Sequence, residues 1–167
     1  MKQVIVLIGI LALTGCSVDS DDGCGSIHSY DSEQKDATGI VLTAGGELYI
    51  DFKTVSKLYQ DTQVCMGMTA IAPIVEVKDF TQHTGSTGGW GIYIFTGHRV
   101  WLNSAIDKII PRNCASDTET LKHEYVHHIL YMNASVETSR NHSNPMFAKC
   151  GRGPYVKDGV PTFTDML

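Results

Sequence analysis

The sequence has no cluster of positive charge. Its 167 residues include 13 Lys and Arg against 18 Asp and Glu, which gives a formal net charge of −5 at pH 7. Proteins that bind nucleic acid gather Lys and Arg on one face or stripe, where these residues neutralise phosphates. The charge pattern therefore argues against a nucleic-acid partner.

Long apolar segments are also lacking. A transmembrane helix needs about 20 consecutive apolar residues. The most apolar run, Val4–Leu13, is only ten residues long, follows Lys2 and precedes Thr14 and Gly15. A short positive start, an apolar run of this length and small residues after it are typical of a secretory signal peptide. We predict such a peptide over residues 1–15.

The four residues Leu13-Thr14-Gly15-Cys16 resemble the lipobox of bacterial lipoproteins. The resemblance implies lipid chains on Cys16, and several acyl chains on one residue would give stable anchoring. Because Ser17 rather than Asp follows, the expected location is the outer membrane if the cell envelope is Gram-negative, on its periplasmic side or at the surface. Ser, Asp and Gly dominate the next residues, so we predict a flexible tether over 16–25 and a single domain over 26–167.

The feature that carries most chemical information is the H-E-x-x-H segment His123-Glu124-Tyr125-Val126-His127. On a helix, positions i and i+4 share a face, so both imidazoles can reach one metal ion. The glutamate between them can polarise a water molecule beside that ion. The segment therefore predicts a zinc hydrolase site, with Zn²⁺ as the cofactor.

The surrounding residues are typical of a helix. Ser116 and Glu119 form an S-x-x-E pattern, which marks helix starts as a capping box. Apolar residues at helical spacing follow as far as Leu130. We therefore predict a helix over residues 117–132 with the motif on it.

A catalytic zinc site needs a third protein ligand and one position open to water. In the metzincin pattern a third His lies six residues after the second, where this chain has Asn133. Two candidates remain, His142 and Glu137. We favour His142, because residues 133–144 are polar and typical of a loop that returns to the metal. A glutamate ligand usually comes from a second helix.

At this point residues 121–150 resemble the SprT-like and related minimal gluzincin-type metallopeptidases, whose third ligand is a His in an H-G-x-x-F type segment. The chain differs in having Ser143 where the family usually has Gly, and its Phe lies one position late. The resemblance implies an α+β, zincin-like domain with an antiparallel or mixed sheet packed on the motif helix, and hydrolysis of peptide bonds. The matching residues are His123, Glu124, His127, His142 and Phe147.

In such a mechanism Glu124 is the general base, and a further donor stabilises the oxyanion. Tyr155, after a Gly-Arg-Gly-Pro turn, is our candidate for that donor. The other candidates are His128, His98 and His83, although His128 should point about 100° away from the metal around the helix. The groups that could orient the ligand imidazoles are Asp107, Asp117 and Glu137.

No C-x-x-C pair occurs, which argues against a cysteine zinc site. The cysteines after the signal are Cys24, Cys65, Cys114 and Cys150. An even number in an oxidising compartment predicts two disulfides, with three possible connectivities. We favour Cys114–Cys150, which would bracket the motif helix and the loop of the third ligand, together with Cys24–Cys65.

The remaining pattern predicts a few further elements. Pro73 lies in a predicted strand over residues 70–77, which it places at an edge of the sheet unless it marks the entry to the strand. The resemblance implies that the hairpin before the motif helix borders the cleft and can pair with an extended substrate. The predicted elements are strands at 40–42, 48–50 and 70–77, a helix at 52–62 capped by Asp51, a hairpin of 91–95 with 100–103, and an irregular tail over 151–167.

These observations predict a lipid-anchored zinc metallopeptidase that acts on polypeptides of the cell envelope or the exterior. One alternative is a non-catalytic surface lipoprotein that binds zinc as a structural or sequestered ion, and another is an interaction module in which the motif is accidental. Glu124 discriminates between them, because a closed structural zinc site has no use for a general base.

Overall fold

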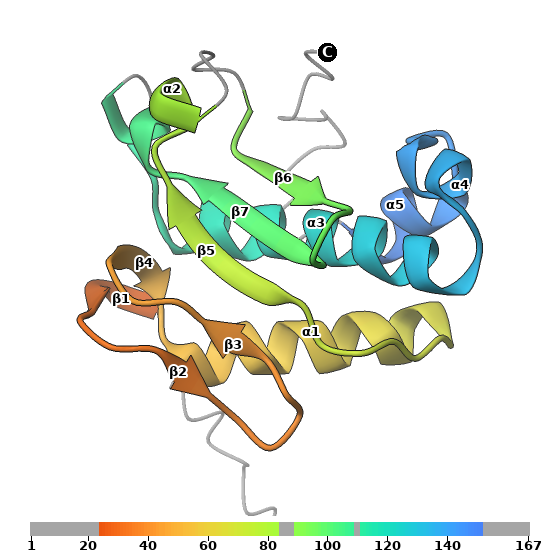
Figure 1. The fold of residues 1–167 in the computed structure, drawn as a ribbon, viewed down its shortest axis with the longest axis horizontal. Coiled ribbons are helices and arrows are strands. Elements are labelled where there is room, and N and C mark those ends of the chain that lie inside the picture. The colour runs from red at the N-terminus through yellow and green to blue at the C-terminus, as the bar shows by residue number, and fades with distance from the viewer. Residues whose placement is uncertain (1–23, 84–88, 109–110, 152–167) are drawn as a thin grey trace, which may run out of the picture.

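The computed structural model describes residues 24–83, 89–108 and 111–151. The predicted signal peptide, Cys16 and Tyr155 therefore lie outside the described residues. Figure 1 shows the order and arrangement of the elements. Their bounds are β1 (Cys24–Tyr30), β2 (Gln34–Lys35), β3 (Val41–Leu42), β4 (Gly46–Ile50), α1 (Phe52–Met66), β5 (Ile74–Lys78), α2 (Phe80–His83), β6 (Gly91–Ile94), β7 (Arg99–Asn103), a 3₁₀ helix (Ser104–Lys108), α3 (Cys114–Asn133), α4 (Val136–Arg140) and α5 (Pro145–Cys150).

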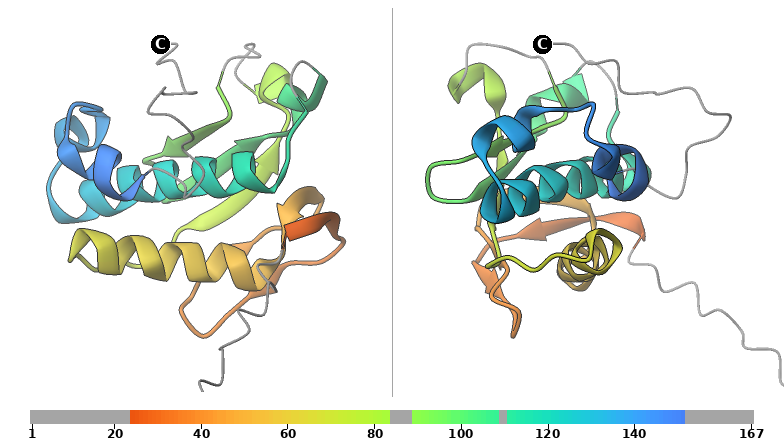
Figure 2. Two further views of the ribbon diagram at one scale, coloured as in Figure 1. Left: turned by 180° about the vertical axis from the view of Figure 1, so that it is seen from behind. Right: turned by 90° about the vertical axis from the view of Figure 1, so that its right-hand side faces the viewer.

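Five strands form a mixed sheet in the order β2-β3-β5-β7-β6. The three inner strands are parallel to one another, and the edge strands β2 and β6 are antiparallel to their neighbours. The long helix α3 packs against this sheet, and α1 packs against α3 (Figure 2). The predicted α+β fold, with a mixed sheet on the motif helix, is confirmed.

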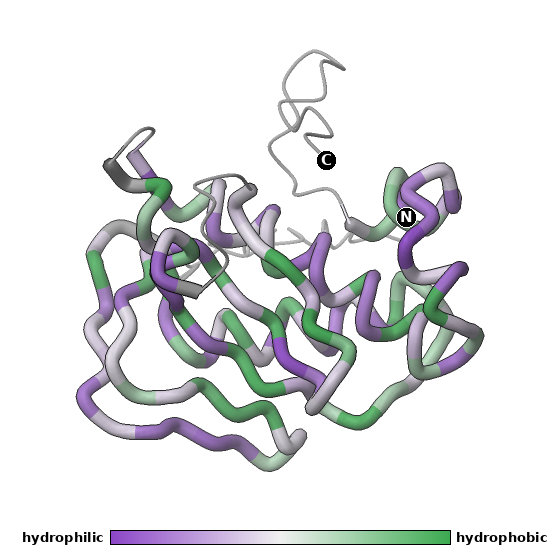
Figure 3. The backbone as a smooth tube through the Cα atoms, turned by 45° about the horizontal axis from the view of Figure 1, so that its top comes forward, coloured by the Kyte–Doolittle hydropathy of each residue, from purple (hydrophilic) through white to green (hydrophobic). Residues whose placement is uncertain are grey.

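The hydrophobic core lies between the sheet and the two long helices. Tyr59 of α1 and Tyr125 of α3 are fully buried and meet edge to face, with ring centroids 5.2 Å apart. The Tyr125 hydroxyl donates to the carbonyl of Val55 at 3.2 Å, so its one polar atom is satisfied inside the core. Figure 3 shows hydrophobic residues along the segments that build this core and hydrophilic residues along the outer segment that contains β2.

Helix α1 begins where its capping residue predicted. The side chain of Asp51 accepts a hydrogen bond from the backbone N–H of Thr54 at 2.7 Å. The helix runs to Met66, four residues beyond the predicted end, and stops at Gly67, whose φ of 65° suits a glycine. The added turn brings Cys65 into the helix, which matters for the disulfide described below.

Helix α3 begins one turn earlier than predicted. Its N-cap is Asn113, and Ser116 occupies the third helical position instead of the cap. The Asn113 side chain accepts from the Ser116 backbone N–H at 3.0 Å, and the Ser116 hydroxyl accepts from the Asn113 N–H at 2.8 Å. The reciprocal box therefore exists, but it starts at Asn113, so the prediction that Ser116 and Glu119 form it was wrong.

A buried ion pair fixes the start of α3 to β4. The Arg112 guanidinium donates to both carboxylate oxygens of Asp117 at 2.9 Å, and both side chains are almost fully buried. Asp117 also accepts from the backbone N–H of Tyr49 at 2.8 Å, and Arg112 donates to the carbonyl of Glu47 at 3.1 Å. Asp117 therefore fixes the start of α3 against β4.

Two strands differ from expectation. Pro73 stands directly before β5, as expected for a strand entry, yet β5 is the central strand of the sheet and not an edge. Strand β1, which the sequence pattern did not predict, pairs with β4 in a separate two-stranded sheet and begins inside the predicted tether. Among the described helices, none combines the length and the apolar composition needed to cross a bilayer.

Candidate metal centre

The structure brings three of the predicted ligands together. His123 and His127 lie one turn apart on α3, and His142 comes from the short segment between α4 and α5. The Nε2 atom of His127 lies 3.2 Å from Nε2 of His123 and 3.1 Å from Nε2 of His142. These three side chains could hold a metal ion.

The spacing of these nitrogens fits a small cation with tetrahedral ligands. With metal–nitrogen bonds of about 2.0–2.1 Å, two tetrahedral ligand atoms lie about 3.3 Å apart. Nε2 of His127 has one lone pair, which cannot accept good hydrogen bonds from both neighbours at once. A shared cation satisfies all three nitrogens, so the donor set fits a metal.

His127 is oriented by the backbone of α4. Its Nδ1–H donates to the carbonyl of Ser139 at 2.6 Å, which leaves Nε2 as the free, ligating atom. The Ser139 hydroxyl donates to the carbonyl of His127 at 2.7 Å. Burial, followed by the neighbouring His123, lowers the pKa of His127 to about 3. The imidazole is therefore neutral at physiological pH, as a metal ligand must be.

Phe147 of α5 forms an apolar wall against the three histidines. Its ring centroid lies 5.1 Å from that of His123, 4.6 Å from His127 and 5.0 Å from His142. The phenyl ring is 7% exposed, whereas His142 is exposed. The aromatic residue that the family resemblance singled out therefore packs on the cluster.

Glu124 follows the first histidine and is buried beneath strand β6. It is 5% exposed, and its carboxylate accepts a hydrogen bond from the backbone N–H of Tyr93. Burial raises the pKa of Glu124 to about 8. A Cβ atom on Gly91 would lie 3.1 Å from Glu124 and 2.5 Å from Thr120, so this position accepts only glycine without displacement.

Strand β6 is an edge strand of the sheet formed by the described residues, and its outer side faces this carboxylate. Asn103 donates to the carbonyl of Trp90 at 2.9 Å, which makes these two a hydrogen-bonded pair. Because such pairs alternate along an antiparallel ladder, Gly91 and Tyr93 direct their N–H and C=O groups away from β7. The Tyr93 N–H then reaches Glu124, so the edge strand borders the candidate site.

The other side of α3 holds a chain of hydrogen bonds that does not involve the cluster. His128 is fully buried and donates through Nε2–H to the carbonyl of Ile71 at 2.6 Å. Its Nδ1 then accepts from the Tyr93 hydroxyl at 3.0 Å, and that oxygen accepts from Nδ1–H of His98 at 3.2 Å. Burial lowers the pKa of His128 to about 4, which keeps this ring neutral. His98 and His128 are therefore not placed to stabilise an oxyanion.

We expect Tyr93→Phe to lower the free energy of unfolding by about 1–3 kcal/mol, because Nδ1 of buried His128 loses its only donor. Urea denaturation measures this loss. Metal content should not change, since the backbone N–H that reaches Glu124 remains. Tyr131 of α3 lies beside Tyr93 of β6, with ring centroids 6.0 Å apart. Tyr131→Phe is therefore the matched control and should change the free energy of unfolding by less than about 0.5 kcal/mol. Equal stability of the two variants would contradict the prediction.

The remaining predicted residues fall elsewhere. Glu137 lies exposed on α4, a short helix inside the stretch predicted as a loop, and it is not part of the described group that could share an ion. The side chains of His83 and Asp107, like Tyr155, lie outside the described part of the chain. Sequence reasoning missed Ser139, Tyr93 and Gly91, of which only Gly91, a glycine opening a predicted strand, gave a signal of close approach.

The disulfide pairing differs from the one we favoured. Cys65 of α1 is bonded to Cys150 of α5, with Cα atoms 5.7 Å apart, and Cys114 is also disulfide-bonded. Gly151 packs near Val126, about 18 Å along α3 from Cys114, whereas a disulfide spans at most about 7 Å between Cα atoms. Cys114–Cys150 and Cys24–Cys65 were therefore wrong, because α5 meets the end of α1 and not the start of α3.

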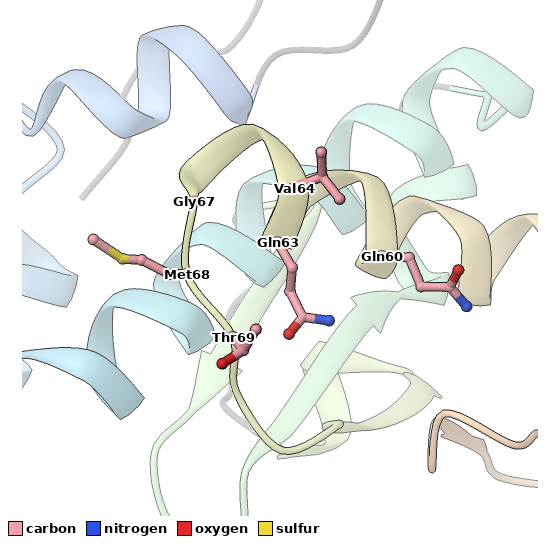
Figure 4. A pocket seen from close by; sticks show the side chains of 6 residues that line it. All are labelled: Gln60, Gln63, Val64, Gly67, Met68 and Thr69. Atoms are coloured by element: carbon pink, nitrogen blue, oxygen red, sulfur yellow. The ribbon is translucent and has the colours of Figure 1, made fainter.

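An open pocket lies at the C-terminal end of α1 (Figure 4). Its lining contains no titratable side chain, and none of its residues belongs to the histidine cluster. It offers apolar contact without groups for catalysis. The lining residues are Gln60, Gln63, Val64, Gly67, Met68 and Thr69.

Comparison of the chain with family models, curated proteins and solved structures gave no match. The resemblance to SprT-like peptidases therefore rests on the motif residues alone, and the structure adds a possible metal site of His123, His127 and His142.

Proposed function

We propose that the protein is a zinc-dependent peptidase. The observation that carries the proposal is the convergence of three imidazole Nε2 atoms next to the buried Glu124, which contacts β6, an edge strand of the described sheet. A structural zinc site uses four protein ligands. The described residues contribute three, which favours a catalytic role over a structural one.

A zinc ion in this cluster would supply Lewis acidity and make water acidic enough to lose a proton near neutral pH. His123, His127 and His142 would hold it through Nε2. The positive charge of an ion in the cluster would favour the ionised form of Glu124 over the protonated form that burial favours. The carboxylate would then take the proton from the attacking water and pass it to the leaving amine. The N–H of Tyr93 keeps that carboxylate in place, and Phe147 excludes water from one side of the cluster.

An extended polypeptide is the substrate that suits the edge of β6. Main-chain N–H and C=O groups at a free edge can pair with an added strand, which gives affinity without demanding a particular side chain. Because the Tyr93 N–H already binds Glu124, an added strand would pair through the other outward-facing main-chain groups of Gly91 and Tyr93, and would pass beside the base. We propose polypeptides of the cell envelope or the exterior as substrates.

We also propose that the protein is anchored to the envelope through lipid on Cys16. The Cys65–Cys150 disulfide is consistent with an extracytoplasmic location, because such bonds persist in oxidising compartments.

Removal and return of the metal test the proposal. Purified protein should contain about one zinc per chain by mass spectrometry and should cleave members of a library of unstructured peptides. Treatment with a chelator should abolish cleavage, and Zn²⁺ should restore it. A folded protein that takes up no zinc on supplementation, or that binds zinc and cleaves no peptide, would contradict a peptidase.

A further inference from the structure

The segment that carries His142 is held at both of its ends. Before it, Ser139 of α4 exchanges two hydrogen bonds with His127, at 2.6 Å and 2.7 Å. After it, α5 is joined to α1 by the disulfide between Cys150 and Cys65. The third ligand therefore lies between a polar tie to α3 and a covalent tie to α1.

The covalent tie is close to the ring that packs on the cluster. Phe147 and Cys150 are three residues apart on α5, so they share a face of that helix. Both side chains are buried in the same core, and the backbone N–H of Gly151 donates to the carbonyl of Phe147 at 3.1 Å. A shift of α5 would therefore move Phe147 against all three imidazoles.

His142 is the most exposed of the three ligands, and its described ring contacts are with His123, His127 and Phe147. Its side chain is exposed, and the turn around it is closed by hydrogen bonds within residues 141–144. His123 and His127, in contrast, are fixed by the regular geometry of α3. Of the three ligands, His142 depends most on the ties at the two ends of its segment.

We propose that the Cys65–Cys150 disulfide controls the metal affinity of the three-histidine cluster by locking α5, and with it Phe147 and His142, against α1. The proposal rests on the metal-dependent function proposed above and adds redox regulation of the same site. With the disulfide closed, the third ligand is held in place. With the disulfide open, the end of α5 is free to move and the third ligand is lost more readily.

The regulating step is thiol–disulfide exchange with a dithiol reductant. One thiolate of the reductant attacks Sγ of Cys65, which is partly exposed, and the Cys150 thiolate leaves. The second thiol of the reductant then attacks the mixed disulfide, forms its own disulfide and releases the Cys65 thiolate. Two electrons pass from the reductant to the cystine, and each thiolate takes up one proton according to its pKa.

The test is the Zn²⁺ affinity of the full chain, measured by competition with a chromophoric chelator. The oxidised protein is compared with protein reduced by a phosphine, which does not bind zinc as dithiols do. A Cys65→Ser/Cys150→Ser variant removes the disulfide without leaving thiols that could bind the ion. A Cys114→Ser variant is the matched control, because Cys114 is disulfide-bonded at the far end of α3.

We expect the reduced protein and the double variant to bind Zn²⁺ about tenfold more weakly than the oxidised protein. Loss of a group that orients a metal ligand typically lowers metal affinity about 10–100-fold, and we expect the lower end of this range. The Cys114→Ser variant should keep the oxidised affinity. Equal affinity in all forms would overturn the proposal and leave the peptidase function standing. Absence of Zn²⁺ binding in every form would instead overturn the proposed function.

Circular dichroism of each form completes the test. Loss of the native spectrum on opening the disulfide would also overturn the proposal, because the bond would then hold the whole domain and not the site.

Discussion

Glu124→Gln should retain about one zinc per chain and lower kcat for peptide cleavage about 10²–10⁴-fold, the usual contribution of a general base. The amide cannot take a proton from water, yet it fits the same buried space and still accepts from the N–H of Tyr93. Steady-state kinetics on a peptide identified in the library measure the effect. Metal content of the same preparation shows that the ligands are intact.

The melting temperature of the metal-free variant gives a second readout. Burial disfavours the charged form of Glu124 and so raises its pKa, which means that the folded protein is less stable with the carboxylate ionised. The uncharged amide should therefore melt no lower than the wild type. Glu137→Gln, the same change at an exposed position on α4, is the control and should leave both kcat and metal content unchanged. A wild-type rate in Glu124→Gln would remove the carboxylate from the mechanism.

His142→Ala should weaken zinc binding about 100-fold. A structural zinc site with four ligands provides roughly 10–16 kcal/mol of binding free energy, or about 3 kcal/mol per ligand, which corresponds to about two powers of ten. The chelator competition assay measures this directly. Because His142 is exposed, its removal should leave the thermal unfolding of the metal-free protein almost unchanged.

His28→Ala, on β1 and outside the cluster, is the matched control and should keep the wild-type zinc affinity. If His142→Ala bound zinc as tightly as the wild type, the third ligand would lie elsewhere and the described cluster would not be the metal site.

Local signals in the sequence predicted the parts of the site that lie on one helix. The H-E-x-x-H spacing fixes His123 and His127 on one face of α3 whatever the rest of the fold, because the helix period alone aligns them. Asp51 located the start of α1, and the two strand-prone runs on either side of residues 96–99 located the β6–β7 hairpin. These features depend on neighbours a few residues away.

The parts that the sequence did not predict depend on distant segments. The pairing of Cys65 with Cys150, 85 residues apart in the sequence, follows from the meeting of α1 with α5. The hydrogen bond from Ser139 to His127 needs the chain to turn back after α3. Strand β1 was missed because most of its residues are small or polar and gain their regular structure from pairing with β4.

The position of Glu124, the proposed general base, depends on the register of the β6–β7 hairpin. Glu124 fits against β6 because Gly91 has no Cβ atom there, and it accepts a hydrogen bond from the backbone N–H of Tyr93. Substitutions of neighbouring side chains that preserve the backbone would therefore leave this contact intact. Slippage of β6 by one residue along β7 would have the opposite effect. It would place Trp90 or Ile92 over the carboxylate and turn the donor inward, so that an otherwise folded chain would be inactive.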